Sequence, residues 1–129
     1  MQLVNKFTMV SMLVSDMNKA KTFYAEKLGL EVATDYRQND NNWWVTLTFP
    51  GGGASITLAR SSTTHNEPAK PGTLSFYFST ADIEAAHTAL KEKGVETGEI
   101  MDNLYGPGSG VKFFQLKDPD GNQITFAQE

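Results

Sequence analysis

The sequence predicts an α+β protein in which one β-α-β-β-β unit occurs twice. Three observations predict it: motifs that recur along the chain, two stretches with helical spacing of apolar residues, and several stretches where apolar and polar residues alternate. The repeat relates Gly29 to Gly94 at an offset of 65 residues, and Ile56 to Ile124 at an offset of 68. We therefore expect a single domain (1–129), with a first module at about 6–60, a linker at 61–72 and a second module at about 73–129.

One helix is predicted near the start of each module. In residues 17–28, apolar side chains recur on one helical face, and Asp16 stands where an N-cap residue is needed. Residues 82–93 repeat this pattern. Gly29 and Gly94 follow the two stretches directly, where a chain leaving a helix often needs a positive φ. Each helix thus has a predicted beginning and end.

The alternating stretches predict four strands in each module. Pro-Gly and Pro-Asp-Gly-Asn sequences are typical of the turns that join the last two strands of each half. The irregular stretch 102–110 is predicted to be a loop. The predicted strands are residues 7–14, 30–36, 43–49 and 54–60 in the first module, and 73–79, 95–101, 111–117 and 122–127 in the second.

Side chains alternate between the two faces of a strand, so each predicted sheet has two different faces. The strongly apolar face should pack under the helices. The other face carries small hydroxyl side chains together with Trp44, Tyr77 and Phe113. One interpretation is that this mixed face is simply exposed to water, as in many antiparallel sheets. Three large aromatic side chains favour the other interpretation, a partly apolar pocket for a ligand.

Composition excludes several classes of function. The formal net charge is −4 and no stripe of Lys and Arg is present, so we expect no nucleic-acid partner. The chain has no cysteine, which excludes disulfides, thiolate metal sites and a cysteine nucleophile. No signal-peptide pattern and no apolar run long enough to span a bilayer occur, so we expect a cytoplasmic protein without a membrane partner.

Four motifs carry a resemblance to a known family. They are MLVSDM (residues 12–17), TFY (22–24), LGL (28–30) and DPDGN (118–122). In this combination the chain resembles the vicinal oxygen chelate superfamily, which includes glyoxalase, extradiol dioxygenases, fosfomycin-resistance enzymes and the bleomycin-sequestering proteins. The resemblance implies two βαβββ modules whose eight strands form a cupped, incompletely closed mixed sheet around a cavity, with the helices outside. It also implies a homodimer.

The resemblance places the family's four metal-ligand positions on Met9, Thr57, Thr73 and Thr125. Neutral hydroxyls and a thioether are poor ligands for the divalent ions such sites hold. The two histidines offer no replacement, because His87 is expected on the flank of the second helix and His65 in the linker. We therefore expect neither a metal nor another cofactor.

Three functions remain open at this point. The first is a metal-free protein that binds or sequesters an aromatic or drug-like small molecule. The second is an enzyme of the same superfamily (a lyase, isomerase or dioxygenase) with atypical metal ligands or none, for which no catalytic residue can be assigned beyond Tyr77 or Tyr105 as an acid or base. The third is an interaction module. The predicted ligand-binding residues are Met9, Ser11, Trp44, Thr46, Ser55, Thr57, Thr73, Ser75, Tyr77, Tyr105, Phe113, Gln115 and Thr125.

Overall fold

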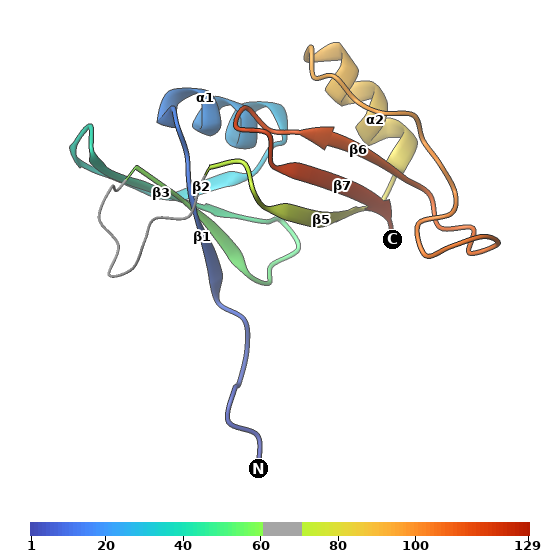
Figure 1. Cartoon of the computed structure of the whole chain (residues 1–129), viewed down its shortest axis with the longest axis horizontal. Coiled ribbons are helices and arrows are strands. Elements are labelled where there is room, and N and C mark those ends of the chain that lie inside the picture. The colour runs from blue at the N-terminus through green and yellow to red at the C-terminus, as the bar shows by residue number, and fades with distance from the viewer. Residues whose placement is uncertain (61–70) are drawn as a thin grey trace. The chain divides into compact units, whose positions relative to one another are not determined.

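The computed structural model describes residues 1–60 and 71–129, which form two compact units, Met1–Pro71 and Gly72–Glu129 (Figure 1). Residues 61–70 of the predicted linker, which include His65, lie outside the described residues. No helix in the described ranges is both long enough and apolar enough to cross a membrane.

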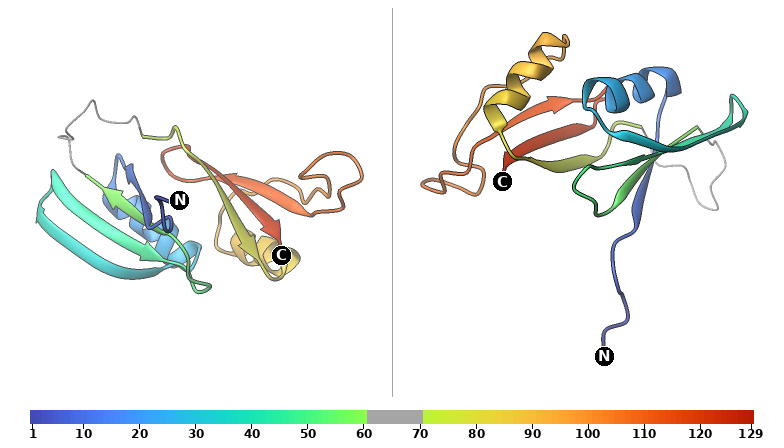
Figure 2. Two further views of the ribbon diagram at one scale, coloured as in Figure 1. Left: turned by 90° about the horizontal axis from the view of Figure 1, so that it is seen from below. Right: turned by 180° about the vertical axis from the view of Figure 1, so that it is seen from behind.

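The first unit contains a four-stranded mixed sheet. Its strand order is β1-β4-β3-β2, with β1 parallel to β4 and the other pairs antiparallel. The helical segment between β1 and β2 covers one face of this sheet (Figures 1 and 2). The elements are β1 (Met9–Leu13), α1 (Met17–Lys21), the π-helical segment η1 (Thr22–Lys27), β2 (Glu31–Asn39), β3 (Asn42–Thr48) and β4 (Ser55–Ala59).

The second unit contains a three-stranded mixed sheet that repeats this plan. Its order is β5-β7-β6, with β5 parallel to β7 and β6 antiparallel to β7. The α+β class and the recurring mixed-sheet plan predicted from the sequence are therefore confirmed. The elements are β5 (Ser75–Thr80), α2 (Ile83–Glu92), β6 (Phe113–Lys117) and β7 (Gln123–Gln128).

The predicted strand at 95–101 is wrong, and the described residues form one sheet of four strands and one sheet of three. This segment makes only two isolated bridges to β6, Thr97 with Leu116 and Met101 with Phe113. Gly98 lies between the two bridges, so close to β6 that a Cβ there would be 3.2 Å from the Gln115 carbonyl oxygen. A glycine inside a strand packs nothing and weakens the pairing, which explains why the ladder is interrupted.

Both predicted helix boundaries at the N-termini are confirmed. The Lys19 N–H donates to Asp16 Oδ1 and the Ala85 N–H donates to Asp82 Oδ1, each at 3.1 Å. These bonds satisfy N–H groups that have no partner within the helix. The first helix differs from expectation in its second half, where hydrogen bonds such as Leu28 N–H to Phe23 O (3.0 Å) have π-helical spacing.

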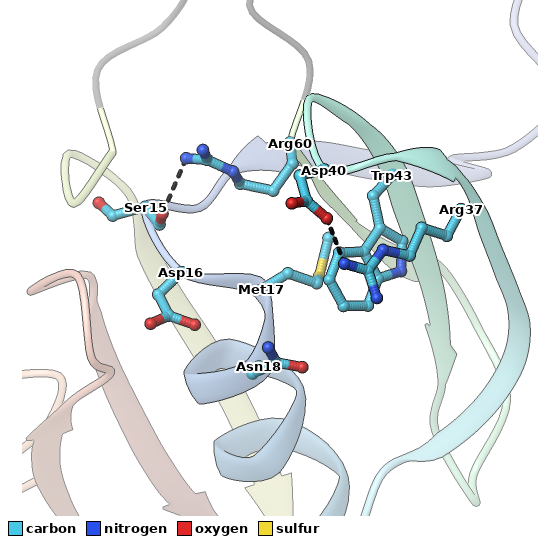
Figure 3. Close-up of a pocket in the computed structure, with 8 residues that line it drawn as sticks. All are labelled: Ser15, Asp16, Met17, Asn18, Arg37, Asp40, Trp43 and Arg60. Atoms are coloured by element: carbon cyan, nitrogen blue, oxygen red, sulfur yellow. Dashed lines mark hydrogen bonds and ion pairs between the residues drawn. The ribbon is translucent and has the colours of Figure 1, made fainter.

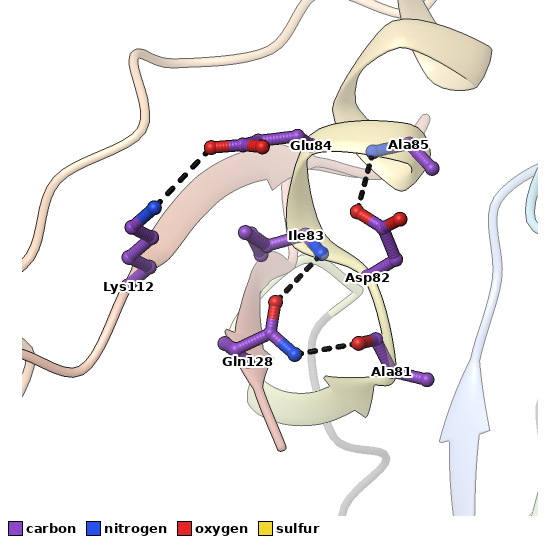
Figure 4. A network of polar contacts seen from close by, with 7 residues as sticks. All are labelled: Ala81, Asp82, Ile83, Glu84, Ala85, Lys112 and Gln128. Carbon is purple, nitrogen blue, oxygen red and sulfur yellow. Dashed lines mark hydrogen bonds and ion pairs between the residues drawn. The ribbon is translucent and has the colours of Figure 1, made fainter.

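Positive φ angles end the helices as predicted, 81° at Gly29 and 80° at Gly94. At the other end of α2, the side chain of Gln128 joins the last strand to the helix start (Figure 4). Its Oε1 accepts from the Ile83 N–H at 2.9 Å and its Nε2 donates to the Ala81 carbonyl at 2.6 Å. These two bonds hold the helix entry against β7.

Each unit has its own buried apolar cluster beneath its helix. Leu47, Leu58 and Tyr24 are fully buried in the first unit. Phe114 and Ile124 are fully buried in the second, where Phe114 stacks on another aromatic ring of the same cluster. Burial of such side chains stabilises each by about 1.5–3 kcal/mol relative to exposure, so these clusters fix which face of each sheet is left open.

Candidate functional site

The face of the first sheet opposite its apolar core brings together most of the binding residues predicted in the first module. Directly paired residues of neighbouring strands point to the same side of a sheet. The register pairs Thr46 with Thr57, Ser11 with Thr57, and Met9 with Ser55. Five predicted side chains from three strands therefore share one face, which we call the open face.

A row of polar contacts crosses the centre of the open face. Thr46 Oγ1 and Thr57 Oγ1 are 3.3 Å apart, and Thr57 Oγ1 lies 3.1 Å from Met9 Sδ. Thr57 is buried, whereas Met9 is exposed at the end of the row. The row is neutral and offers hydroxyl groups as both donors and acceptors, which suits orientation of an uncharged polar group on a ligand.

An aromatic pair lies beside this row. The rings of Tyr36 and Trp44 are stacked with centroids 4.4 Å apart and planes at 26°. Their exposed fractions are 46% and 37%, so both rings keep large surfaces open to solvent. Tyr36 was not among the binding residues predicted from the sequence, although it lies in the predicted strand 30–36. The β2–β3 register, which sets Tyr36 opposite Trp44, decides its position.

The second sheet has a corresponding group of polar side chains. Its register pairs Thr125 with both Gln115 and Tyr77, so the three share one face. Gln115 Nε2 donates to Thr125 Oγ1 at 3.3 Å, and Thr125 is fully buried. Tyr77 is largely exposed and Phe113 is buried on the same side. Ser75, two residues before Tyr77, completes this group.

Two predicted site residues lie outside the strands. Thr73 comes two residues before β5, which begins at Ser75. Tyr105 lies in the predicted loop 102–110 and is 75% exposed. Thr73 was predicted from the resemblance and from the alternation of a strand expected at 73–79, but β5 begins only at Ser75.

A small pocket of about 210 Å³ opens on the helix side of the first unit (Figure 3). Its charged side chains bind neighbouring groups of the same unit. The Arg37 guanidinium lies 4.2 Å from the Trp43 ring centroid and pairs with Asp40, whose pKa it lowers through their hydrogen bond. Arg60 Nη1 donates to the Ser15 carbonyl at 2.7 Å. The pocket is lined by Ser15, Asp16, Met17, Asn18, Arg37, Asp40, Trp43 and Arg60.

Asp35, on the same side of the sheet, links β2 to the helix and to β3. It pairs with Lys21, and its Oδ1 accepts from Trp43 Nε1 at 2.8 Å. The hydrogen bond from Lys21 and then that from Trp43 hold the pKa of the Asp35 carboxyl below its usual value. The ionised form of this carboxyl is therefore favoured in the folded state.

This shift makes part of the stability dependent on pH. A carboxyl in the unfolded chain takes up a proton near pH 4, before the folded one does, so the contribution of Asp35 is complete above that range and is lost as the pH falls through the folded pKa. We expect Asp35→Asn to lose less stability than the native chain on acidification. Urea unfolding at pH 6 and pH 3.5 measures this, and Lys21→Met should show part of the effect, because the hydrogen bond from Trp43 to Asp35 remains. Equal losses in all three proteins would contradict it.

Comparison with known proteins identifies the family. Residues 6–126 match the model of the Glyoxalase/Bleomycin resistance protein/Dioxygenase superfamily. The chain belongs to this superfamily. YetH of Bacillus subtilis (strain 168) is 28% identical over 122 residues, covering 93% of this chain and 95% of YetH.

Solved structures of the superfamily agree with this assignment. TnmS3, an antibiotic binding protein from Streptomyces sp. CB03234, superposes with a TM-score of 0.80 at 26% identity, over 99% of this chain and 98% of its own. A Glyoxalase/bleomycin resistance protein/dioxygenase superfamily member from Sphaerobacter thermophilus gives a TM-score of 0.78 at 28% identity, over 99% and 100% of the two chains.

The metal used by many superfamily members does not fit the residues of this chain. Thr57 and Met9 contact each other through a hydroxyl and a thioether, and Thr125 is a buried hydroxyl bonded to Gln115. Thr73 adds only another neutral hydroxyl. In residues 1–60 and 71–129, no three His, Cys, Asp or Glu side chains gather as metal ligands. Hard and borderline divalent ions need carboxylates or imidazoles, so the donor set at these four positions does not suit such an ion.

His87 has the helix-flank position predicted from the sequence. Its Nε2 lies 2.8 Å from the Gly98 carbonyl oxygen and 3.3 Å from Thr97 Oγ1. Its ring also packs edge-on against Phe114, with centroids 4.9 Å apart. These contacts hold the segment after α2 against the helix, which is a structural role.

Proposed function

We propose that this protein binds a planar, partly aromatic small molecule without a metal, as a sequestering protein rather than as a catalyst. The observation that carries the proposal is the stacked pair Tyr36 and Trp44, exposed on the open face beside the Thr46–Thr57–Met9 row. A flat ligand ring can continue the stack, and the hydroxyls can bond polar groups at its edge.

The surroundings of the aromatic pair favour an uncharged ligand. Trp44 and Thr46 are paired in register with Ala59 and Thr57 on one side, and with Tyr36 and Thr34 on the other. None of these side chains is charged at neutral pH. A charged ligand group placed here would lose hydration without gaining an ionic partner.

TnmS3 supports an antibiotic as the ligand class. It is described as an antibiotic binding protein, and its match covers nearly the whole of both chains. Antibiotics with fused aromatic rings combine a flat apolar body with polar edges, which is the chemistry that the open face offers. We infer that such a compound is the physiological ligand, and that binding it lowers its free concentration.

The decisive experiment is a titration of neutral, planar aromatic antibiotics followed by isothermal calorimetry. We expect Trp44→Ala to weaken binding at least about tenfold, because it removes a stacking surface worth about 1.4 kcal/mol. Trp44→Phe should retain most of the affinity, since a flat ring remains. Tyr105→Ala removes an aromatic ring that is more exposed than Trp44 and lies in a distant part of the sequence, and it serves as the control.

Fluorescence gives a second measure of the same binding. Of the two tryptophans, Trp43 is buried and Trp44 is exposed, so a stacked ligand should quench mainly Trp44. Unchanged affinity in Trp44→Ala, or a loss equal to that in Tyr105→Ala, would show that the ligand does not use the open face.

We also propose that the protein acts as a homodimer in the cytoplasm. A chain without cysteine needs no oxidising compartment for its stability. Sedimentation of the purified protein over a range of concentrations tests the dimer.

A further inference from the structure

The pocket on the helix side of the first unit is built from several connections of one compact unit (Figure 3). Residues 15–18 come from the β1–α1 connection and the start of α1, Asp40 from the turn between β2 and β3, and Arg60 from the chain directly after β4. The ring of Trp43 on β3 adds an apolar wall. Because successive residues of a strand point to opposite faces, the pocket lies on the other side of the sheet from Trp44 and the open face.

Four charged side chains line this pocket, and their formal charges cancel. Arg37 and Arg60 are positive, whereas Asp16 and Asp40 are negative. A simple anion would meet two carboxylates here, and a simple cation would meet two guanidinium groups. Like charges brought together in this way oppose binding. A small molecule that carries both charges finds a partner for each of them.

The Arg60 guanidinium keeps one edge open for a ligand. Its Nη1 donates to the carbonyl oxygens of Ser15 at 2.7 Å and of Val14 at 3.3 Å. Its Nε and Nη2 donate to no group within residues 1–60 and 71–129. These two nitrogens form the fork that binds a carboxylate through two parallel hydrogen bonds.

The two carboxylates also keep acceptor capacity. Asp40 uses Oδ1 for Arg37, and Asp16 uses Oδ1 for the Lys19 N–H, so in the described part of the chain the second oxygen of each accepts no hydrogen bond. The pKa of Asp40 is lowered mainly by the hydrogen bond from Arg37, and the charge of Arg60 lowers it further. Figure 3 shows the Arg60 and Asp40 side chains as neighbours on one rim of the pocket.

We propose that this pocket binds a small α-amino acid in its zwitterionic form. The ligand carboxylate accepts from Nε and Nη2 of Arg60, and the ligand ammonium group donates to the open oxygen of Asp40. An α-amino acid carries both charges beside one carbon atom, which suits a cation and an anion that are neighbours. The pocket volume of about 210 Å³ is below the roughly 300–1,000 Å³ typical for drug-sized ligands, so a small side chain fits. This site is separate from the ligand proposed for the open face.

An NMR titration with four probes tests the chemistry of recognition. We expect L-alanine to shift the indole N–H signal of Trp43 and to saturate with a dissociation constant on the order of 1 mM. Acetate and methylamine carry one charge each, and 4-aminobutanoate carries its two charges far apart. Each should bind at least about tenfold more weakly, because it loses one charged partner or cannot reach both. No saturable shift with L-alanine, or equal binding of acetate, would overturn the proposal.

Trp44→Ala separates this site from the open face. The chain has two tryptophans, so this variant leaves only the Trp43 indole signal. Its affinity for L-alanine should equal that of the native protein, whether or not an aromatic ligand binds the open face. A loss of L-alanine binding in Trp44→Ala would show that the amino acid does not occupy the helix-side pocket.

Charge-removing substitutions test the two contacts. Arg60→Gln should raise the dissociation constant for L-alanine at least about tenfold, since the fork is lost. Arg60 also holds the β1–α1 connection, so Asp40→Asn, in an exposed turn, gives a test that does not depend on that contact. Asp40→Asn should weaken L-alanine but not acetate, because only the ammonium group loses its partner.

The matched controls make the same charge changes in the second unit. Lys91 and Asp102 are exposed there, and Lys91→Gln and Asp102→Asn should bind L-alanine as the native chain does. Affinities of Arg60→Gln and Asp40→Asn equal to those of these controls would contradict the proposed site.

Discussion

Replacing Phe114 with alanine should lower the free energy of unfolding by about 3–5 kcal/mol. Phe114 is fully buried in the second unit, stacked on Phe126 with centroids 5.1 Å apart and packed edge-on against His87. The substitution removes this apolar surface from the core and leaves a cavity that its neighbours can only partly fill. Urea-induced unfolding followed by circular dichroism measures the change.

Two further variants define this effect. Phe114→Leu keeps most of the volume and should cost less than half as much. Tyr105→Ala, which removes a ring that is exposed, should change stability by less than about 0.5 kcal/mol. A cost in Phe114→Ala no larger than that in Tyr105→Ala would show that the second unit does not depend on this core.

The second large effect is expected at Asn122, where alanine should cost about 2–4 kcal/mol. Its side chain is buried, and it connects the start of β5 to the turn between β6 and β7. Asn122 Nδ2 donates to Asp118 Oδ2 at 2.7 Å, and its Oδ1 accepts from the Leu74 N–H at 2.9 Å. Alanine removes both bonds, so a buried carboxylate and a partly buried N–H each lose a partner.

The comparison for Asn122 is an asparagine outside any such network. Asn103 lies exposed in the loop after the bridge at Met101. We therefore expect Asn103→Ala to unfold at the same urea concentration as the native protein. Asp118→Asn should fall between the two, because it keeps the shape of the turn but loses the charge that accepts from the backbone N–H groups of Asp120 and Asn122. A negligible effect of Asn122→Ala would show that the turn holds its form without this side chain.

Local features were predicted well because their causes lie within a few residues. Asp16 and Asp82 cap helices through bonds to N–H groups three residues ahead. Gly29 and Gly94 take positive φ because they follow a helix directly. The segment 95–101 shows where this reasoning fails, because its alternation suits a strand but the close approach of Gly98 to β6 depends on a partner far along the chain.

The sequence by itself determined the α+β class, the repeat and the helix boundaries, because residue type and spacing suffice for these. The resemblance to the superfamily was needed to locate the neutral side chains at the positions where relatives place metal ligands. Only the tertiary structure decided that Tyr36 stacks on Trp44 and that Thr57 is buried. Such facts depend on which strand pairs with which and in what register. The pairing energy that sets register is shared among residues distant in sequence, so no local pattern specifies it.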